Sequence, residues 1–308
     1  MTHAARPLQA RPRDRVDVRS GATTCAAWHY AGTNGACVVM ATGLGLTRRS
    51  TDVFAARFNA EGFTVLAFDY RRFGDSGGEP RHVVRVDEQV QDLLAAADFA
   101  ATLPRVDRGR VALWGFSLGG GHVIRAAAER DDVAAAVAQA PTADGRAAAV
   151  NAMRSATPGS LARLTAVALA DATRGVFGGA PSLVPVAGAR GSVAMLGTPD
   201  AMEWRQALDR GEIDAGSEPR VAARFALTSG RYRPVTAAGR VRCPLLVVAY
   251  DNDRSALPGP AIRAAERAPL GELVRRPGGH YAGFGSDLEE TVAVELAFLR
   301  RHLLGASA

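Results

Sequence analysis

Residues 115–119 of this chain read Gly-Phe-Ser-Leu-Gly, and they follow directly on a short apolar run at residues 111–114. We predict that this run is a strand, that the chain turns sharply at the serine and that residues 118–129 form a helix. Both glycines are required because a side chain at either position would collide with the adjoining strand or helix. The turn leaves Ser117 clear of the sheet at the positive end of a helix, which suits a nucleophile that must carry an oxyanion.

A nucleophile of this kind needs two backbone N–H groups that bind the oxyanion. One belongs to the residue after the nucleophile, which is Leu118. The second is expected in the loop after an early strand, and the apolar run at residues 37–41 is followed by Thr-Gly-Leu-Gly at residues 42–45. We therefore expect Leu44 and Leu118 to form an oxyanion hole.

A general base and an acid are expected late in the chain. His280 follows two glycines, which suits a loop that reaches over the edge of a sheet, and we expect it to be the base. A buried strand at residues 245–250 is followed by Asp251 and Asp253, whose side chains would point in opposite directions if the strand continued. Asp253, Asp251 and Asp144, which follows an earlier strand, are the candidates for the acid.

Four segments together resemble the α/β-hydrolases, and in particular the bacterial serine hydrolases called dienelactone-hydrolase-like or Xaa-Pro-peptidase-like. These segments are residues 38–49, 68–78, 113–121 and 247–280. They lie on both sides of a central insertion and span most of the chain. The resemblance implies a mostly parallel central sheet with helices on both faces, a helical lid inserted after the sixth strand, and the chain order serine, aspartate, histidine.

The resemblance also bears on the acid and on the oxyanion loop. The family has Gly-Asp-x-Asp where residues 250–253 read Tyr-Asp-Asn-Asp, and this pattern favours the second aspartate, Asp253. Residues 42–43 read Thr-Gly where the family usually has His-Gly. A hydroxyl would then brace the loop in place of a ring, and the backbone donor of Leu44 stays in place.

Apolar periodicity predicts an α/β fold in which strands and helices alternate. We expect strands at residues 15–19, 23–30, 37–41, 63–68, 110–114, 133–138 and 245–250, and helices at residues 51–61, 87–103 and 118–129. Ser50 is expected to cap the first of these helices, and Gly62 is expected to end it in a left-handed conformation.

The regular alternation stops in the middle of the chain, which divides it into parts. We expect a mobile N-terminal tail at residues 1–13, an α/β-hydrolase core at residues 14–140 and 240–308, and an inserted lid at residues 141–239. Helical patterns within the lid cover residues 160–174, 199–208 and 221–229. A lid over the nucleophile would exclude water and shape an acyl pocket.

Composition limits the partners of the protein. All 37 basic residues counted as Lys and Arg are arginine, and they are spread along the chain, so we expect no nucleic-acid partner in spite of a net charge of +6. The N-terminal residues lack the apolar core of a secretory signal and no stretch is long enough to span a bilayer, so we expect a cytoplasmic protein without a membrane partner. The three cysteines are expected to be buried free thiols.

These residues predict a serine hydrolase that acts on a carboxylic ester or thioester. His280 would take the proton of Ser117 as it attacks the acyl carbon, and Asp253 would hold the imidazole. The alternative is a lyase or cyclase of specialised metabolism that uses the same three residues while the lid keeps water out. The expected partner is a small-molecule acyl substrate, free or carried on a thioester. No metal, phosphate or dinucleotide motif is present, so we expect no cofactor. The sequence leaves the oligomeric state open.

Overall fold

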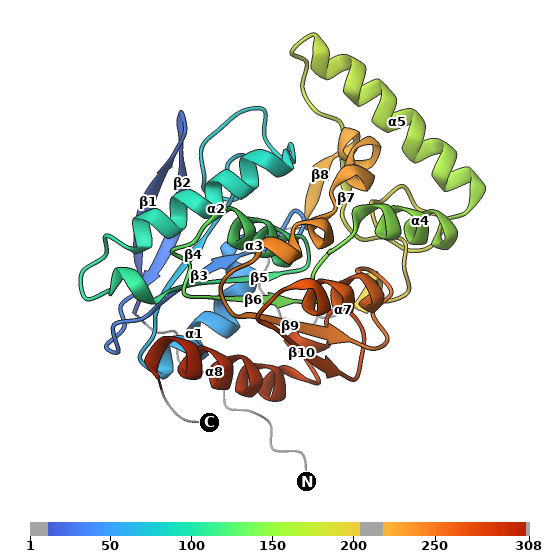
Figure 1. Cartoon of the computed structure of the whole chain (residues 1–308). Coiled ribbons are helices and arrows are strands. Elements are labelled where there is room, and N and C mark those ends of the chain that lie inside the picture. The colour runs from blue at the N-terminus through green and yellow to red at the C-terminus, as the bar shows by residue number, and fades with distance from the viewer. Residues whose placement is uncertain (1–11, 204–217, 306–308) are drawn as a thin grey trace.

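The computed structural model describes residues 12–203 and 218–305, which form a central sheet covered by helices (Figure 1). Within the described residues the sheet has eight strands in the order β1-β2-β4-β3-β5-β6-β9-β10. β2 is antiparallel to β1 and to β4, and the other neighbouring strands are parallel. The strands are β1 (Asp14–Ser20), β2 (Thr23–Tyr30), β3 (Cys37–Ala41), β4 (Thr64–Phe68), β5 (Val111–Phe116), β6 (Ala135–Gln139), β9 (Leu245–Tyr250) and β10 (Gly271–Arg276).

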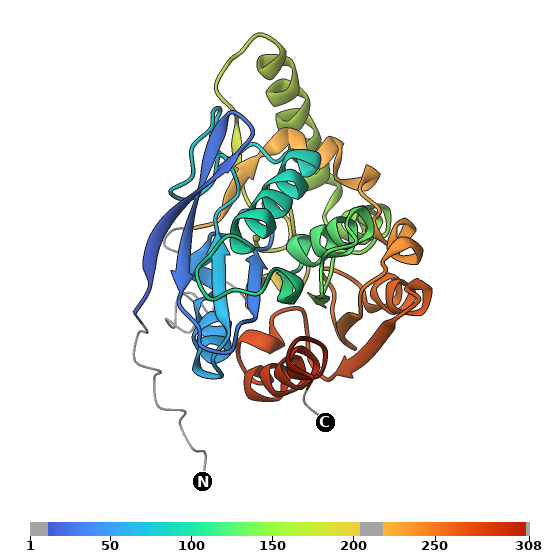
Figure 2. The same ribbon diagram turned by 60° about the vertical axis from the view of Figure 1, so that its left-hand side comes forward.

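Helices pack on both faces of the sheet, each face having its own hydrophobic cluster (Figure 2). One face is covered by α2 (Val86–Ala100), α3 (Leu118–Glu129) and α7 (Pro258–Arg267). The other is covered by α1 (Asp52–Ala60) and α8 (Leu288–Leu304). Because the central strands are buried on both sides, every residue of β3 and of β9 is buried, which explains their continuous apolar runs. The predicted α/β class is confirmed.

The carboxyl ends of the parallel strands lie along one edge of the sheet. β5 ends between β3 and β6, where Ala41 is opposite Gly115 and Phe116 is opposite Gln139. In open parallel sheets, ligands bind outside this edge. The loops that follow β3, β5, β6 and β9 are therefore placed to form a site.

Residues 141–239 connect β6 to β9. They contain α4 (Gly145–Ser155), α5 (Pro158–Val176) and a separate ribbon of β7 (Leu183–Pro185) and β8 (Arg220–Ala222). In Figure 1, α5 projects away from the body of the sheet. The helical pattern predicted at residues 160–174 is part of α5. α4 was not predicted, although Asp144 caps it by accepting the N–H groups of Arg146 and Ala147.

The helix predicted at residues 221–229 is wrong. Val221 belongs to β8 and pairs with Val184 of β7, and Ala223–Leu227 form a 3-10 helix. The pairing with a distant strand outweighs the local helical pattern, as tertiary contacts commonly do. Of the helix predicted at residues 199–208, residues 204–208 lie outside the described residues.

The start of the first core helix also differs from the prediction. Arg48–Thr51 form a 3-10 helix, the hydroxyl of Ser50 donates to the carbonyl of Thr47, and α1 begins at Asp52. Ser50 therefore bonds backwards along the chain instead of capping α1. Gly62 follows the helix with a φ of 86°, which is the left-handed conformation predicted.

The predicted mobile tail is described only at residues 12–13, since residues 1–11 lie outside the described residues. The guanidinium carbon of Arg13 lies 3.5 Å from the centroid of the Trp28 ring, and the guanidinium donates to the hydroxyl of Tyr30. Arg13 is thus anchored on β2 by a cation–π contact rather than belonging to a tail.

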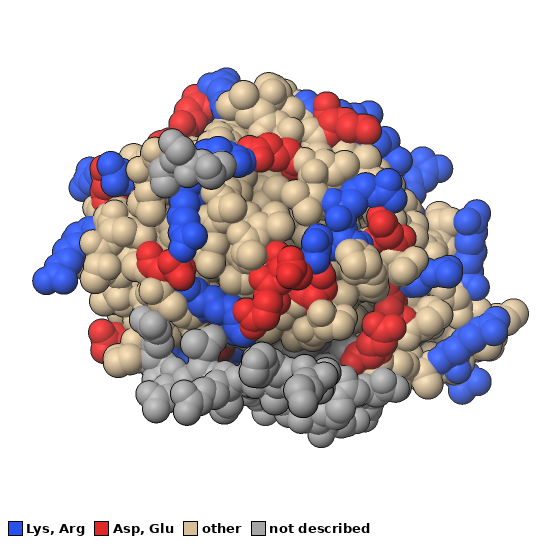
Figure 3. All heavy atoms as spheres, turned by 90° about the horizontal axis from the view of Figure 1, so that it is seen from below, with Lys and Arg blue, Asp and Glu red and all other residues tan. Residues whose placement is uncertain are grey.

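Charged side chains of both signs are interspersed on the face seen in Figure 3. Ion pairs such as Arg57 with Glu289 and Arg242 with Asp131 join segments that are far apart in the sequence.

The three cysteines are buried free thiols, as predicted. Among the described helices, none combines the length and the apolar character needed to cross a bilayer.

The core between the sheet and α8 contains an ionisable side chain. Glu295 is fully buried, and its Oε2 accepts the indole N–H of Trp114 at 2.9 Å. Its Oε1 has no hydrogen-bond partner among the described residues. Burial raises the pKa of Glu295 to about 8, and the bond from Trp114 opposes this only in part. Glu295 is therefore mainly neutral in the folded protein at neutral pH.

We expect Glu295→Gln to remove a pH dependence of stability. The folded protein keeps this proton up to about pH 8, whereas the unfolded chain releases it near the ordinary value of 4.5. The free energy of unfolding of the wild type should therefore fall as pH rises between these values, by at most about 1.4 kcal/mol per pH unit. The amide of the variant cannot ionise but can accept the same bond from Trp114. Denaturant unfolding at about pH 5 and about pH 8 measures the effect. A difference between the two proteins that did not grow with pH would contradict it.

Candidate active site

β5 and α3 meet in a turn whose apex is Ser117. This residue has a φ of 55° and a ψ of −117°, a combination that side-chain-bearing residues rarely adopt. A Cβ at Gly115 would lie 2.4 Å from the carbonyl oxygen of Gly119. A Cβ at Gly119 would lie 2.5 Å from the carbonyl oxygens of both Ala41 and Thr42. Any side chain at these positions would overlap backbone atoms, so both glycines are required for the reason predicted.

Ser117, His280 and Asp253 form a hydrogen-bonded chain. The Oγ of Ser117 lies 2.9 Å from Nε2 of His280, and Nδ1 of the same ring lies 2.7 Å from Oδ2 of Asp253. Because a carboxylate only accepts hydrogen bonds, we assign the ring proton to Nδ1, which leaves Nε2 to accept from the serine. The structure thus brings together the three side chains that the sequence analysis selected.

Asp253 is the only one of the three candidate acids that bonds to His280. Its Oδ1 accepts the N–H groups of Ser255 at 2.8 Å and Ala256 at 2.7 Å, which leaves Oδ2 facing the ring. Asp251 instead pairs with Arg275 at the surface. Asp144 instead caps α4 and pairs with Arg233.

His280 is buried, with an exposed fraction of 1%. Its ring centroid lies 4.9 Å from that of Phe116, and this contact holds the imidazole over the end of β5. Burial disfavours the imidazolium and lowers the pKa of His280, but the charge of Asp253, its hydrogen bond and the charge of Asp200 together raise the pKa above its ordinary value. The surroundings of His280 therefore favour the imidazolium, which is the form the ring takes after it has accepted a proton as a general base.

Asp200 is a second buried carboxylate behind the hydrogen-bonded residues, and it was not predicted from the sequence. Its Oδ2 accepts the N–H groups of Arg254 at 2.7 Å and Ser255 at 3.1 Å, and its Oδ1 accepts the hydroxyl of Ser255 at 2.8 Å. Asp200 comes from the insertion, whereas Arg254 and Ser255 belong to the loop that carries Asp253. In the sequence it appears only as an acid in the first turn of a predicted helix, so no local signal marks it.

Leu44 and Leu118, the two residues predicted to form an oxyanion hole, both line the cavity beside Ser117. Leu118 is the first residue of α3, so its N–H has no acceptor within the helix. Leu44 lines the same cavity as Ser117 and Leu118. The hydroxyl of Thr42 donates to the carbonyl of Leu46 at 3.1 Å, so a hydroxyl braces this loop as expected.

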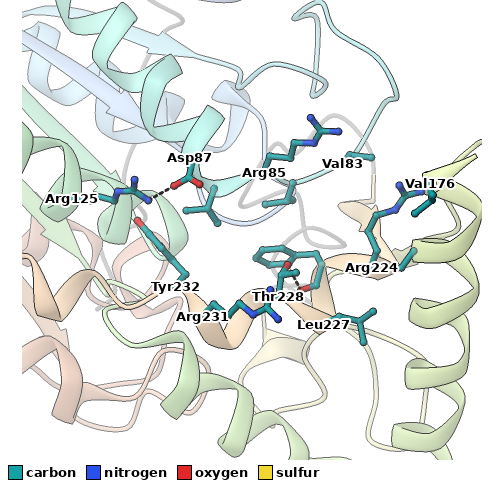
Figure 4. Close-up of a pocket in the computed structure, with 15 residues that line it drawn as sticks. Val83, Arg85, Asp87, Arg125, Val176, Arg224, Leu227, Thr228, Arg231 and Tyr232 are labelled. Carbon is teal, nitrogen blue, oxygen red and sulfur yellow. Dashed lines mark hydrogen bonds and ion pairs between the residues drawn. The ribbon is translucent and has the colours of Figure 1, made fainter. Parts of the chain in front are cut away.

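A cavity of about 90 Å³ opens beside Ser117. None of the described residues that line it is charged: Leu44, Ser117, Leu118, Thr142, Gly145, Ala148, Ala149, Ala152, Met195, Leu196, Phe225, Ser229, Tyr232 and Ser255. A larger cleft of about 570 Å³ is not lined by Ser117, Leu44 or Leu118, and charged side chains stand around it (Figure 4).

Nowhere in the described parts of the chain do three or more His, Cys, Asp or Glu side chains gather as metal ligands would.

The chain is similar to several known proteins. The chain matches the family model described as serine aminopeptidase, S33, over residues 32–279. It is 36% identical to the quorum-quenching protein AidA of Acinetobacter baumannii, over 94% of this chain and 96% of the relative.

Two fungal proteins are also similar. The crystal structure of the α/β-hydrolase GrgF from Penicillium superposes with a TM-score of 0.80 at 26% identity, covering 95% of this chain and 99% of that one. GrgF is named a polyketide transferase. The thiohydrolase aneE of Aspergillus aculeatus is 37% identical over 95 residues, which is 30% of each chain.

We expect Asp200→Asn to lower the pKa of His280. The substitution removes one of the negative charges that favour the imidazolium, while the charge of Asp253 stays in place. Titration of the His280 ring protons by NMR measures the effect, with the signal assigned through His280→Gln. Asp251→Asn is the matched control, because this carboxylate is paired with Arg275 at the surface, and it should leave the His280 titration unchanged. An unshifted His280 titration in Asp200→Asn would contradict the argument.

Proposed function

The chain belongs to the serine aminopeptidase S33 family of α/β-hydrolases, and we propose that it cleaves a carboxylic ester or thioester through an acyl-enzyme on Ser117. The predicted α/β-hydrolase fold is confirmed by the superposition on GrgF. The observation that carries the proposal is the hydrogen-bonded chain from Ser117 through His280 to Asp253. A serine hydroxyl is a weak nucleophile at neutral pH, and a base oriented by a third group is what activates it.

In the first half of the proposed reaction, Oγ of Ser117 bonds to the acyl carbon while Nε2 of His280 takes the hydroxyl proton. Asp253 holds the ring in the required tautomer and stabilises the imidazolium. The N–H groups of Leu44 and Leu118 donate to the oxyanion that develops on the acyl oxygen. When the bond to the leaving oxygen or sulfur breaks, His280 returns the proton to that atom.

In the second half, water attacks the acyl-enzyme. His280 takes a proton from this water, and the new bond forms between the water oxygen and the acyl carbon. The bond from the acyl carbon to Oγ then breaks, and the proton on His280 passes to Ser117. The products are a carboxylic acid and the alcohol or thiol released earlier, and the enzyme is restored without a cofactor.

The walls of the cavity favour an ester or thioester over a peptide with a free amino end. An aminopeptidase must bind the ammonium of its substrate, whereas the described lining residues beside Ser117 carry no charge. Relatives named thiohydrolase, polyketide transferase and quorum-quenching protein support a small-molecule acyl substrate.

Transfer of the acyl group to an acceptor other than water is a second candidate, and it includes the cyclase alternative. The name of GrgF as a polyketide transferase favours it, as does the near-complete burial of His280 and Asp253. Product analysis in the presence of an added alcohol separates the two, because a transferase forms the new ester in preference to the free acid.

We expect Asp253→Asn to lower kcat for p-nitrophenyl butyrate by about a thousandfold or more, since the imidazole loses its orienting carboxylate. Asp251→Asn is the matched control, because this neighbouring carboxylate does not bond to His280, and it should stay close to wild type. Ser117→Ala should abolish both turnover and covalent labelling by a fluorophosphonate.

Burst kinetics with the activated ester provide the further check, since an acyl-enzyme releases its first p-nitrophenol before steady state. Undiminished hydrolysis or labelling in Ser117→Ala would overturn the proposal. Equal losses in Asp253→Asn and Asp251→Asn would overturn the assignment of the acid.

A further inference from the structure

The cavity beside Ser117 adjoins a second cavity. The first has a volume of about 90 Å³ and the second of about 180 Å³. An apolar cavity of roughly 150 Å³ holds a molecule the size of benzene, so the first accepts only a small group and the second accepts a larger one. Four residues line both cavities, Ala149, Ala152, Met195 and Ser229, and we call the boundary that they form the passage.

Small or flexible side chains form this passage. Ala149 and Ala152 lie one turn apart on α4 and offer only methyl groups to it. Met195 is unbranched and has three rotatable bonds, so its side chain can move aside without a change in the backbone. An extended chain that starts at Ser117 can therefore continue into the second cavity.

The second cavity has mainly apolar walls. α4 contributes Met153, α5 contributes Leu161 and Leu164, and Ala194 and Ala226 also line the cavity. The polar groups among its described lining residues are hydroxyls of serine and threonine, and no lining residue is charged. Such walls favour methylene groups over water or charged groups.

The first cavity also borders the cleft of Figure 4, but larger side chains form that boundary. Phe225 and Tyr232 line both the first cavity and the cleft, so two aromatic rings stand there where two alanines stand at the passage. The hydroxyl of Tyr232 lies 2.7 Å from Nδ1 of the buried His122, which fixes the ring in place. The cleft itself is lined by charged side chains, among them Arg85, Arg125 and Asp87. An apolar chain bound there would exclude water from these charged groups and would offer them no hydrogen-bond partners.

We propose that the second cavity is an acyl-chain subsite, and that the substrate is an ester or thioester of an unbranched aliphatic acid of medium length. The acyl carbon lies at Ser117, the chain passes Met195, and its end lies between α4 and α5. The inference rests on the proposed function, since it assigns a place to the acyl group that Ser117 accepts. In this subsite, the side chains of Ala149, Ala152 and Met195 determine which acyl-chain lengths the enzyme accepts.

The test is a series of p-nitrophenyl esters from acetate through hexanoate to decanoate. The wild type should show a kcat/KM that rises by about tenfold or more from acetate to the best longer ester. Ala152→Leu places a branched side chain in the passage and should lower the ratio of decanoate to acetate activity by about tenfold. Ala147→Leu makes the same change on the same helix at a residue that lines neither cavity, and it should leave the ratio unchanged.

Met195→Ala widens the passage and should raise the same ratio, which keeps the test informative if Ala152→Leu folds poorly. A ratio that neither variant changes, in protein whose hydrolysis still depends on Ser117, would overturn the subsite. Wild-type activity that is highest on acetate would also overturn it. Absence of Ser117-dependent hydrolysis on every ester would instead overturn the proposed function, so the two failures are distinguishable.

Discussion

The site depends first on how closely the backbone of α3 approaches the end of β3. Gly119 sits against the carbonyl groups of Ala41 and Thr42, where a methyl group would not fit. This contact sets the start of α3 beside the loop that carries Leu44. At the turn before α3, Ser117 adopts a φ of 55°, a strain that costs on the order of 1–3 kcal/mol. Backbone bonds offset that strain: the N–H of Ser117 donates to Gln139, and its carbonyl accepts from Thr142.

The acid of the hydrogen-bonded chain is held from two sides. The loop that carries Asp253 is folded by its own N–H groups, which turn one carboxylate oxygen toward the ring. The same loop is held from outside by Asp200, whose three hydrogen bonds come from Arg254 and Ser255. Bonds to an ionised acceptor are stronger than neutral ones, and a buried carboxylate requires them. The position of Asp253 is thus determined jointly by the core and by the insertion.

Several parts of the site could be predicted from local sequence, and the family pattern added the choice of Asp253. β3 and β9 begin and end where their apolar runs do, because strands that are buried on both faces are apolar at every position and their ends are therefore easy to recognise in the sequence. The turn at Ser117 was predictable because its two glycines directly follow an apolar run in the sequence. Gly115 is required by contacts within this strand-turn-helix unit, and Gly119 is required by the carbonyl groups of Ala41 and Thr42 at the end of β3.

The wrong predictions concern segments whose structure is determined by contacts other than the local pattern. Residues 221–229 carry a helical pattern, but Val221 belongs to β8, which pairs with β7 in a two-stranded ribbon. Ser50 was predicted to be the N-cap of α1, a position that needs an extended backbone, whereas Arg48–Thr51 form a 3-10 helix. Asp200 meets partners more than fifty positions away in the chain, at Arg254 and Ser255, so its importance depends on tertiary contacts that no local pattern reports.

One short segment of the insertion contacts both the cavity and the acid loop. Met195 and Leu196 line the cavity beside Ser117, and Thr198 and Asp200 bond to Ser255. Ser255 lines that cavity as well, and its N–H also donates to Asp253. A backbone shift at residues 195–200 that made room for a larger acyl group would therefore also move the bonds that support the acid. Because protein interiors are closely packed, such a shift would reach Asp253 and through it His280. Size tolerance in this cavity thus has to come from side-chain rotation, and among these residues Met195 has the side chain best able to provide it.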